Sequence, residues 1–520
     1  MSLGLVSFAG EVNVSAVLAA VIAISLVYLV YFLDEKPYKG FPVIGLDKNG
    51  FFKMAKARAA WIVNGCEILE QGAKQFSGAF QVITASGPKI VLPNRYANEI
   101  RNNPHMSFGK IITREFFSCY PGFEPFDTLN QDAIIQDAIK NKLTQSLTLF
   151  TSDISTEVTA VLSSILDGNA AKEDDAGWAE TPLRALVARV IAQVTSRVFL
   201  GPHLSQDPEW LSLCTNYAVT AFAAQQALLS WSPILRPLVH RFLAPCRQLR
   251  ALTAVGRRVI GPHLAGASKG EGAETAAAAA AAAAKGDMIA WMEELARERR
   301  REFNFADAQI MLAIAAIHTT SEAYVWVVAD LIEHPEYAGA LREEVASVLG
   351  DGGWRKDSLA RMKLLDSFIK ESHRRHMVDA LVMDRYVEKT VTLSDGLTIP
   401  AGSALMVHAT NNLDEKFWPN AKGFDGYRFL RLRERAGEEN RHQLVTTSAE
   451  HLGFGLGLHA CPGRFFAANT MKLLLAQFVM KYDWKFVDEK PQLRAAFGSS
   501  VYVNPMLKVA ARRRKEEVRI

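Results

Sequence analysis

The sequence has few cysteines and little net charge for its length. Its 520 residues include 5 cysteines, which are scattered and odd in number, so no disulfide framework can be read and a reducing compartment is indicated. The formal net charge is only +4, which does not favour bulk binding of nucleic acid, and we expect no nucleic-acid partner. Apolar residues make up 49% of the chain, enough for a large core.

The sequence also lacks the patterns of nucleotide-binding and repeat folds. No Gly-x-Gly-x-x-Gly fingerprint follows an expected strand, so the sequence gives no sign that this chain itself binds a nicotinamide or flavin dinucleotide. Strand patterns do not alternate with helical ones, which argues against a doubly wound sheet, and no repeat of solenoid period is present. Most of the chain is helical in pattern, and hairpins are expected at 80–92 and 387–407. We therefore expect a mainly α fold with small β-sheets.

The N-terminus carries one long apolar run. Residues 14–33 are uncharged and long enough to cross a bilayer as a helix. Lysines follow the run, whereas Glu11 is the only charge before it, so the positive-inside rule places the rest of the chain in the cytosol. A cleaved signal peptide fits less well because no basic segment precedes the run. We predict a membrane anchor at 1–34 and a catalytic domain at 35–520.

The most informative segment is Phe-Gly-Leu-Gly-Leu-His-Ala-Cys-Pro-Gly at 454–463. Its glycines allow the backbone to approach a flat ligand closely. The apolar run that follows, Arg464–Met480, predicts a helix with Cys461 at its start. The sulfur would there face the positive end of the helix dipole, which favours the thiolate. One thiolate without a second cysteine or histidine at ligand spacing suits haem iron better than tetrahedral zinc. The alternative is a structural cysteine buried in a tight turn.

This loop resembles the haem-thiolate signature of the cytochrome P450 family, Phe-x-x-Gly-x-His/Arg-x-Cys-x-Gly. Every slot is filled here, by Phe454, Gly457, His459, Cys461 and Gly463. The resemblance implies the haem-thiolate fold of that family, preceded by one transmembrane helix. It implies haem b as the cofactor and Cys461 as the axial ligand of its iron. Phe454, Gly457, His459 and Gly463 would then bind the cofactor.

The same resemblance implies a structural role for a second set of residues. Glu371 and Arg374 are three apart on a helix expected at 364–375, so they share a face. Taken alone they would form a solvated surface pair. The family pattern instead implies a buried triad with Arg428 that holds the cysteine loop in shape, and its charges must then satisfy one another.

The resemblance also points to partners for the haem propionates. His459, two residues before the cysteine, matches one such contact. Arg385, which follows the 364–375 helix, matches another less closely. Lys140 or Lys142 is a further candidate, although a solvated lysine is the simpler interpretation.

One long helix is expected at 304–334, capped by Asn304 and stopped by Pro335, and it contains the run Ala-Ala-Ile-His-Thr-Thr at 315–320. The resemblance implies that small Ala315 and Ala316 leave room for oxygen and substrate. It implies that the hydroxyl of Thr319 hydrogen-bonds oxygen and helps pass protons, although a lone mid-helix threonine ordinarily bonds the carbonyl four residues earlier.

The run departs from the family pattern at His318, which stands where that pattern has an acid. A histidine can titrate near neutral pH and relay protons. It can equally be a neutral, hydrogen-bonded core residue, and both interpretations stay open.

The resemblance implies a monooxygenase of the endoplasmic reticulum membrane, single-pass, with its catalytic domain in the cytosol. Segments 107–110, 121–126 and 460–467 look most like fungal members of the ent-kaurene-oxidase-like group, so the expected substrate is a lipophilic terpenoid or other secondary metabolite. The implied partner is an NADPH-dependent flavoprotein reductase, whose acidic surface Arg464 and Lys472 are candidates to meet.

Two other functions compete with this one. A haem-thiolate isomerase or dehydratase needs no oxygen and often lacks the threonine that stands here at 319. A non-catalytic haem-binding sensor would ordinarily carry a signalling domain, for which the sequence has no pattern.

Overall fold

The computed structural model describes residues 35–47, 53–167, 177–266, 286–350, 353–355 and 357–515, together with 15, 17–19 and 21. The predicted anchor at 1–34 lies almost wholly outside the described residues. Within the described part of the chain, one helix, Phe305–Glu333, is long and apolar enough to cross a bilayer. Most of its side chains are buried in the protein, so it is a core helix.

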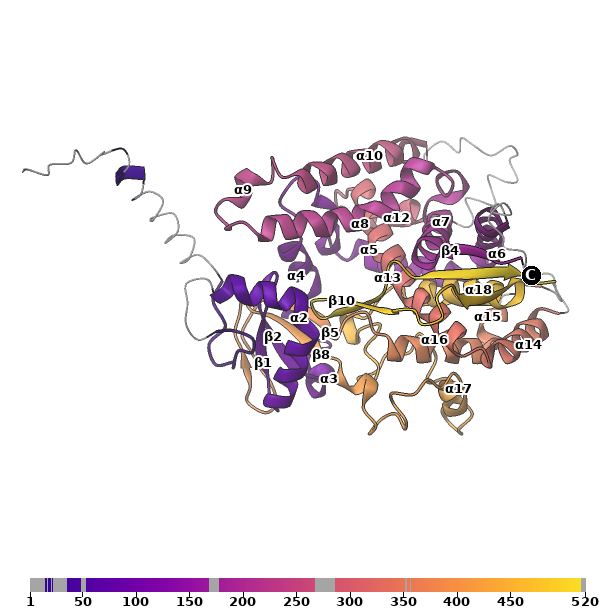
Figure 1. Ribbon diagram of the computed structural model, residues 1–520. Helices are drawn as coiled ribbons and strands as arrows, with labels where there is room; N and C mark the ends of the chain where they lie inside the picture. Colours follow the sequence, from indigo (N-terminus) through magenta and orange to yellow (C-terminus); the bar gives the residue numbers. More distant parts are fainter. Residues whose placement is uncertain are drawn as a thin grey trace, which may run out of the picture.

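The fold is mainly helical, as expected, and its longest helix lies at the centre (Figure 1). The main helices are α2 (Lys53–Gln75), α6 (Thr144–Leu166), α7 (Leu183–Leu204), α8 (Pro208–Leu229), α10 (Ala244–Gly266), α12 (Met288–Glu298), α13 (Phe305–Glu333), α14 (Tyr337–Leu349), α16 (Lys363–Arg375) and α18 (Arg464–Lys481). Helix α13 packs against α7, α8, α10, α16 and α18. Side chains from these helices form the largest hydrophobic core.

Short helical segments connect the main helices. They are η1 (Asn94–Tyr96), α3 (Ala97–Ile100), α4 (Phe108–Glu115), η2 (Glu124–Asn130), α5 (Ile134–Asp137), the π-helical η3 (Ala138–Leu143), α9 (Arg236–Val239), α15 (Ser358–Arg361), η5 (Thr410–Leu413), α17 (Arg428–Arg433) and η6 (Gly457–His459). Several of them bring chain segments distant in sequence to the loop that contains Cys461.

Local sequence explains the ends of α13. The side chain of Asn304 accepts a hydrogen bond from the backbone N–H of Asp307 at 3.0 Å and so caps the first turn. The helix ends at Glu333, with His334 as its C-cap, directly before Pro335. The predicted helix is thereby confirmed, and so is the one predicted at 364–375, which is α16.

The β-structure is confined to small sheets. A five-stranded sheet has the order β1 (Phe80–Thr84), β2 (Gly87–Pro93), β8 (Ala404–His408), β5 (Leu381–Val387) and β3 (Met106–Ser107). The smaller sheets pair β10 (Arg494–Phe497) with β11 (Ser500–Val503), β6 (Val391–Thr392) with β7 (Thr398–Ile399), and β12 (Lys508–Arg513) with both β4 (Ala179–Pro182) and β9 (Tyr482–Phe486). A second core lies between the five-stranded sheet and residues 449–456, which lead into the cysteine loop.

The hairpin predicted at 80–92 is confirmed, whereas the single hairpin predicted at 387–407 is wrong. β1 and β2 form the antiparallel hairpin expected at 80–92. The segment 387–407 is divided instead into four strands, and β5 pairs with β8 while the two-residue β6 and β7 pair with each other. Pro400 has no N–H to donate and Gly402 turns the chain at φ +82°, so a single long strand cannot run through them.

Candidate functional site

The loop that contains Cys461 is held closed by its own backbone. The N–H of Cys461 donates to the carbonyl of Phe454 at 2.8 Å. Gly457 has φ +72°, and a Cβ placed there would lie 2.5 Å from the carbonyl oxygen of Arg101. Glycine is therefore required at 457 because the chain after α3 packs against the loop, which is a different cause from the ligand approach that the sequence suggested. Gly463 has no such neighbour within 4 Å.

The helix after the cysteine covers the apolar run predicted for it, but its N-cap is not Cys461. α18 starts at Arg464 with Gly463 as its N-cap, so Cys461 precedes the helix. Burial raises the pKa of the Cys461 thiol above its usual value, while backbone N–H groups of Gly463 and Arg464 and the charge of Arg464 act in the opposite direction. The N–H groups at the helix start thus favour the thiolate as expected, and burial opposes them. A metal cation bound to the sulfur would remove the proton outright.

The predicted triad of charges is present and buried. The guanidinium of Arg374 donates to both oxygens of Glu371, at 2.7 and 2.9 Å, and Nε of Arg428 donates to Glu371 Oε2 at 3.0 Å. Glu371 and Arg374 are 0% exposed. Other donors of the two arginines reach the backbone carbonyls of Asn412, Ala421 and Pro419. The pairing and burial of the triad are therefore confirmed.

Helix α16 supports the cysteine loop through a histidine that sequence reasoning did not single out. The ring of His373 packs on Phe454 with centroids 4.8 Å apart and on His451 at 5.2 Å. Gly453 leaves the space for this ring, since a Cβ there would lie 2.4 Å from it. Burial lowers the pKa of His373 to about 4, so the ring is neutral. The sequence signal that could have identified His373 is its position between Glu371 and Arg374.

Cationic groups gather beside the other end of the loop. Arg385 lies on β5 after a bulge at which Met383 has φ +56°, and it is 2% exposed. Its Nη1 donates to the carbonyl of Asp384 at 2.8 Å, but Nε and Nη2 have no hydrogen-bond partner among the described residues. Burial and the nearby charges of Arg385 and Lys140 lower the pKa of His459 to about 4, and its Nε2–H donates to the carbonyl of Met106.

The two unpartnered N–H groups of Arg385 are an observation that bears on a cofactor. A buried guanidinium with free donors is costly unless an anion accepts them. Carboxylates, such as the propionates of haem, are the anions that match its fork of donors. The residues present near the cysteine loop therefore fit a flat group that carries carboxylates.

One face of α13 is exposed although most of the helix is buried. Ala315 and Thr319 are exposed and Ala316 is half-buried, whereas Ile317 is 0% exposed. The hydroxyl of Thr319 donates to the carbonyl of Ala315 at 2.6 Å. α13 also packs against α16, which contacts the cysteine loop, and against α18, which follows it.

His318 points to a neighbouring helix. Its Nε2–H donates to the carbonyl of Cys214 on α8 at 3.1 Å. Burial is the main cause that lowers the pKa of His318, and the charge of Arg184 adds to it, so the ring is neutral at physiological pH. These contacts match the second of the two interpretations, a hydrogen-bonded core residue.

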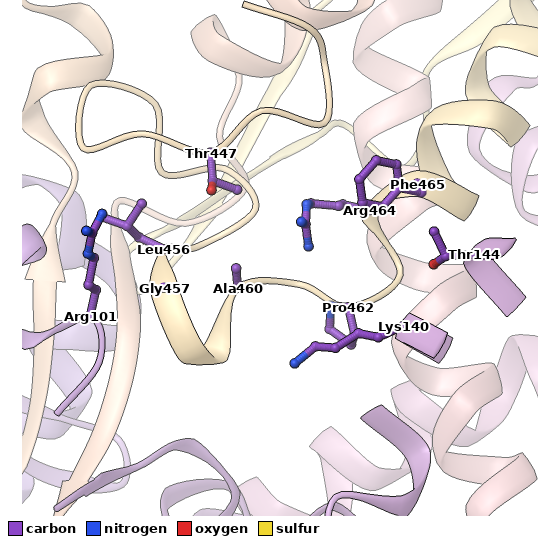
Figure 2. Close-up of a pocket in the computed structure, with 10 residues that line it drawn as sticks. All are labelled: Arg101, Lys140, Thr144, Thr447, Leu456, Gly457, Ala460, Pro462, Arg464 and Phe465. Carbon is purple, nitrogen blue, oxygen red and sulfur yellow. The ribbon is translucent and has the colours of Figure 1, made fainter. Parts of the chain in front are cut away.

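A cavity of about 500 Å³ borders the loop (Figure 2). Arg101, Lys140 and Arg464 give it a basic lining. Arg464 also donates to the carbonyls of Cys461 and Val445, at 2.9 and 3.2 Å. Lys472, in contrast, is only 6% exposed and pairs with Asp366 at 2.7 Å. The expectation that Lys472 meets a partner protein is wrong, because tertiary packing buries it.

Comparisons with known proteins agree with this geometry. A family profile described as Cytochrome P450 matches residues 288–508. A cytochrome P450 monooxygenase 1 of Gibberella fujikuroi is 37% identical over 85% of this chain and 99% of its own. Cytochrome P450 monooxygenase bsc2 of Alternaria brassicicola is 37% identical over 94% and 92%, and monooxygenase pyr3 of Aspergillus fumigatus is 36% identical over 88% and 86%.

Proposed function

The chain belongs to the cytochrome P450 family, and from that premise we propose that it oxidises a lipophilic small molecule with oxygen from O2, at a haem held by Cys461. It is an oxidoreductase of the monooxygenase type, and the cofactor of its family is haem with a cysteine thiolate as axial ligand. The observation that carries the proposal is a lone cysteine in a closed loop, together with a buried arginine near His459 whose two donors have no partner among the described residues.

Haem b fits the residues around the loop. Cys461 would ligate the iron through its sulfur. Arg385 would hold a propionate with its free Nε and Nη2 donors, and the neutral His459 and Lys140 lie near enough to share that role. Phe454 and Gly457 would keep the loop in place, while Gly463 would leave space beside it. When bound, the haem supplies the activation of dioxygen.

Helix α13 would form the opposite wall. Ala315 and Ala316 present little side chain, which leaves room for oxygen and substrate. The hydroxyl of Thr319 would hold and pass a proton at Oγ1. The hydrogen bond from His318 to Cys214 supports a structural role for this histidine over a proton relay.

We further propose that electrons come from an NADPH-dependent flavoprotein reductase. The basic lining of the cavity beside the cysteine loop supports this, since acidic partners are steered to basic surfaces. We also propose that residues 1–34 anchor the enzyme in the endoplasmic reticulum membrane, with the domain from 35 to 520 in the cytosol. The substrate is proposed to be a terpenoid or other secondary metabolite, because segments 107–110, 121–126 and 460–467 resemble fungal members of the ent-kaurene-oxidase-like group.

Labelled oxygen tests the proposal. The haem-loaded chain, a reductase and NADPH are incubated under ¹⁸O2 with extracts of a host that lacks the native pathway, and products are analysed by mass. One ¹⁸O atom per product supports a monooxygenase. An unlabelled isomer or dehydrated product would favour the isomerase or dehydratase, and no product with normal carbon monoxide binding would favour a sensor.

A further inference from the structure

An acid lies one helical turn beyond His318 on α13. Glu322 is four residues after His318 and three after Thr319. Residues three and four apart are neighbours on a helix surface, with Cβ atoms about 5–6 Å apart. Glu322 is therefore next to the threonine on the exposed face and next to the histidine that replaces the family's acid.

Glu322 is buried, and one of its two carboxyl oxygens accepts no hydrogen bond from the described residues. The side chain is 3% exposed, and its Oε1 accepts a hydrogen bond from the N–H of Val503 on β11 at 2.6 Å. Oε2 has no hydrogen-bond partner among the described residues, although Nη2 of Arg184 lies 3.1 Å from it. Burial raises the pKa of Glu322, while the charge of Arg184 and the Val503 N–H oppose that rise. Burial thus favours the protonated form of this carboxyl more than water would.

Arg184 connects this carboxyl with solvent. It lies on α7, and its side chain is 40% exposed. Its charge also lowers the pKa of His318, which places the guanidinium near both residues. Two further titratable groups lie on this side. Tyr502 of β11 has its ring 5.7 Å from the Arg184 guanidinium, and Asp379 accepts a hydrogen bond from Ser500 of the same strand and acts electrostatically on Tyr502. Arg184 thus links solvent with Glu322, which stands three residues from Thr319 on α13.

We propose that Glu322 supplies protons to the Thr319 hydroxyl, in place of the acid that is absent at 318. The proton leaves Oε2 of Glu322 for a water bonded to Thr319 Oγ1, and Glu322 regains a proton from solvent beside Arg184. No electron moves in these steps. Glu322 acts through Thr319 and is a positioning residue for the reaction. The inference rests on the monooxygenase function proposed above.

A purely structural role would be to hold the β10–β11 hairpin through Val503. Glu322→Gln separates the two roles, because glutamine keeps an acceptor for the Val503 N–H and cannot carry an acidic proton. Glu157→Gln is the matched control. Glu157 is a buried glutamate on α6 that accepts from Gln193 at 2.6 Å and lies on a different helix.

Two readouts are made on haem-loaded protein. The first is product formed per NADPH consumed, with peroxide assayed alongside. Glu322→Gln should lower this ratio about tenfold and raise peroxide, at unchanged haem content and melting temperature. Glu322→Asp should restore part of it, and Glu157→Gln should match the parent. An unchanged ratio in Glu322→Gln would overturn the proposal.

The second readout needs no turnover. The pH-difference infrared spectrum of the resting protein should contain a protonated-carboxyl band that Glu322→Gln removes and Glu157→Gln keeps. Persistence of all such bands in Glu322→Gln would overturn the proposal. If the parent forms no product, the monooxygenase function fails while this readout still tests the protonation of Glu322.

Discussion

Arg374 holds Glu371 with two parallel hydrogen bonds, at 2.7 and 2.9 Å, in a place where neither side chain reaches solvent. Both residues lie on α16, and His373, which stands between them in the sequence, packs on Phe454 of the cysteine loop. The same two side chains also join α16 to other segments, through the carbonyls of Asn412 and Ala421 and through Arg428.

Removal of one partner of this pair should act through folding. Glu371→Ala leaves two buried guanidinium groups without their carboxylate, and the free energy of unfolding should fall by roughly 3–5 kcal/mol. Urea unfolding measures this, together with the yield of haem-loaded protein. Glu438→Ala, which removes a surface partner of His442, is the control and should change stability by less than about 1 kcal/mol. Equal effects of the two variants would contradict the account.

His373 should make stability depend on pH. Its folded pKa, about 4, is below the ordinary value of 6.5, so the unfolded chain binds the proton more readily. Its contribution to stability is complete above pH 6.5 and is lost as pH falls toward 4, by a few kcal/mol at most. The pH dependence of the unfolding free energy in this range should weaken in His373→Phe but persist in His263→Phe, at an exposed histidine of α10. An identical slope in parent and His373→Phe would show that the ring is not buried neutral.

The two loop glycines should respond differently to alanine. Gly457→Ala places a Cβ against the Arg101 carbonyl and strains a left-handed residue, so we expect a loss of about 1–3 kcal/mol. Gly463 has φ −85° and no neighbour within 4 Å, so Gly463→Ala should stay within about 0.5 kcal/mol. Thermal unfolding of haem-free protein makes the comparison. Equal losses would refute the packing of the loop against Arg101.

Arg385→Ala should have opposite effects on the haem-free and haem-loaded protein. Without haem, the variant removes a buried, partly unpartnered charge and should unfold no more easily than the parent. With haem, it removes the proposed propionate contact, and haem should transfer to an acceptor globin about tenfold faster or more. Arg258→Ala, at an exposed ion pair with Glu209, is the control. Unchanged transfer would remove Arg385 from the cofactor site.

The sequence predicts features that depend on short-range spacing. The Glu371–Arg374 pair follows from two residues three apart on one helix, and the start of α13 follows from the Asn304 cap. The sequence does not predict features set by distant packing. Lys472 is buried because Asp366 and the carbonyl of Leu359 bind its amine.

The candidate site likewise combines features that the sequence predicts with features that depend on distant packing. The loop and its cysteine are evident from residue types, while the free donors of Arg385 depend on a bulge in β5. The hydrogen bond that holds Glu322 comes from Val503 of the C-terminal strand β11, which is distant from α13 in the sequence.

The reduced, carbon monoxide-bound Soret band of Cys461→Ala tests the central claim most directly. Nothing in the sequence within the loop offers a second thiolate, since 454–463 contains one cysteine. The parent should give the band position of a thiolate-ligated haem, and the variant should lose it even where haem is retained. A variant that keeps the thiolate band would show that Cys461 is not the ligand and would contradict the proposed site.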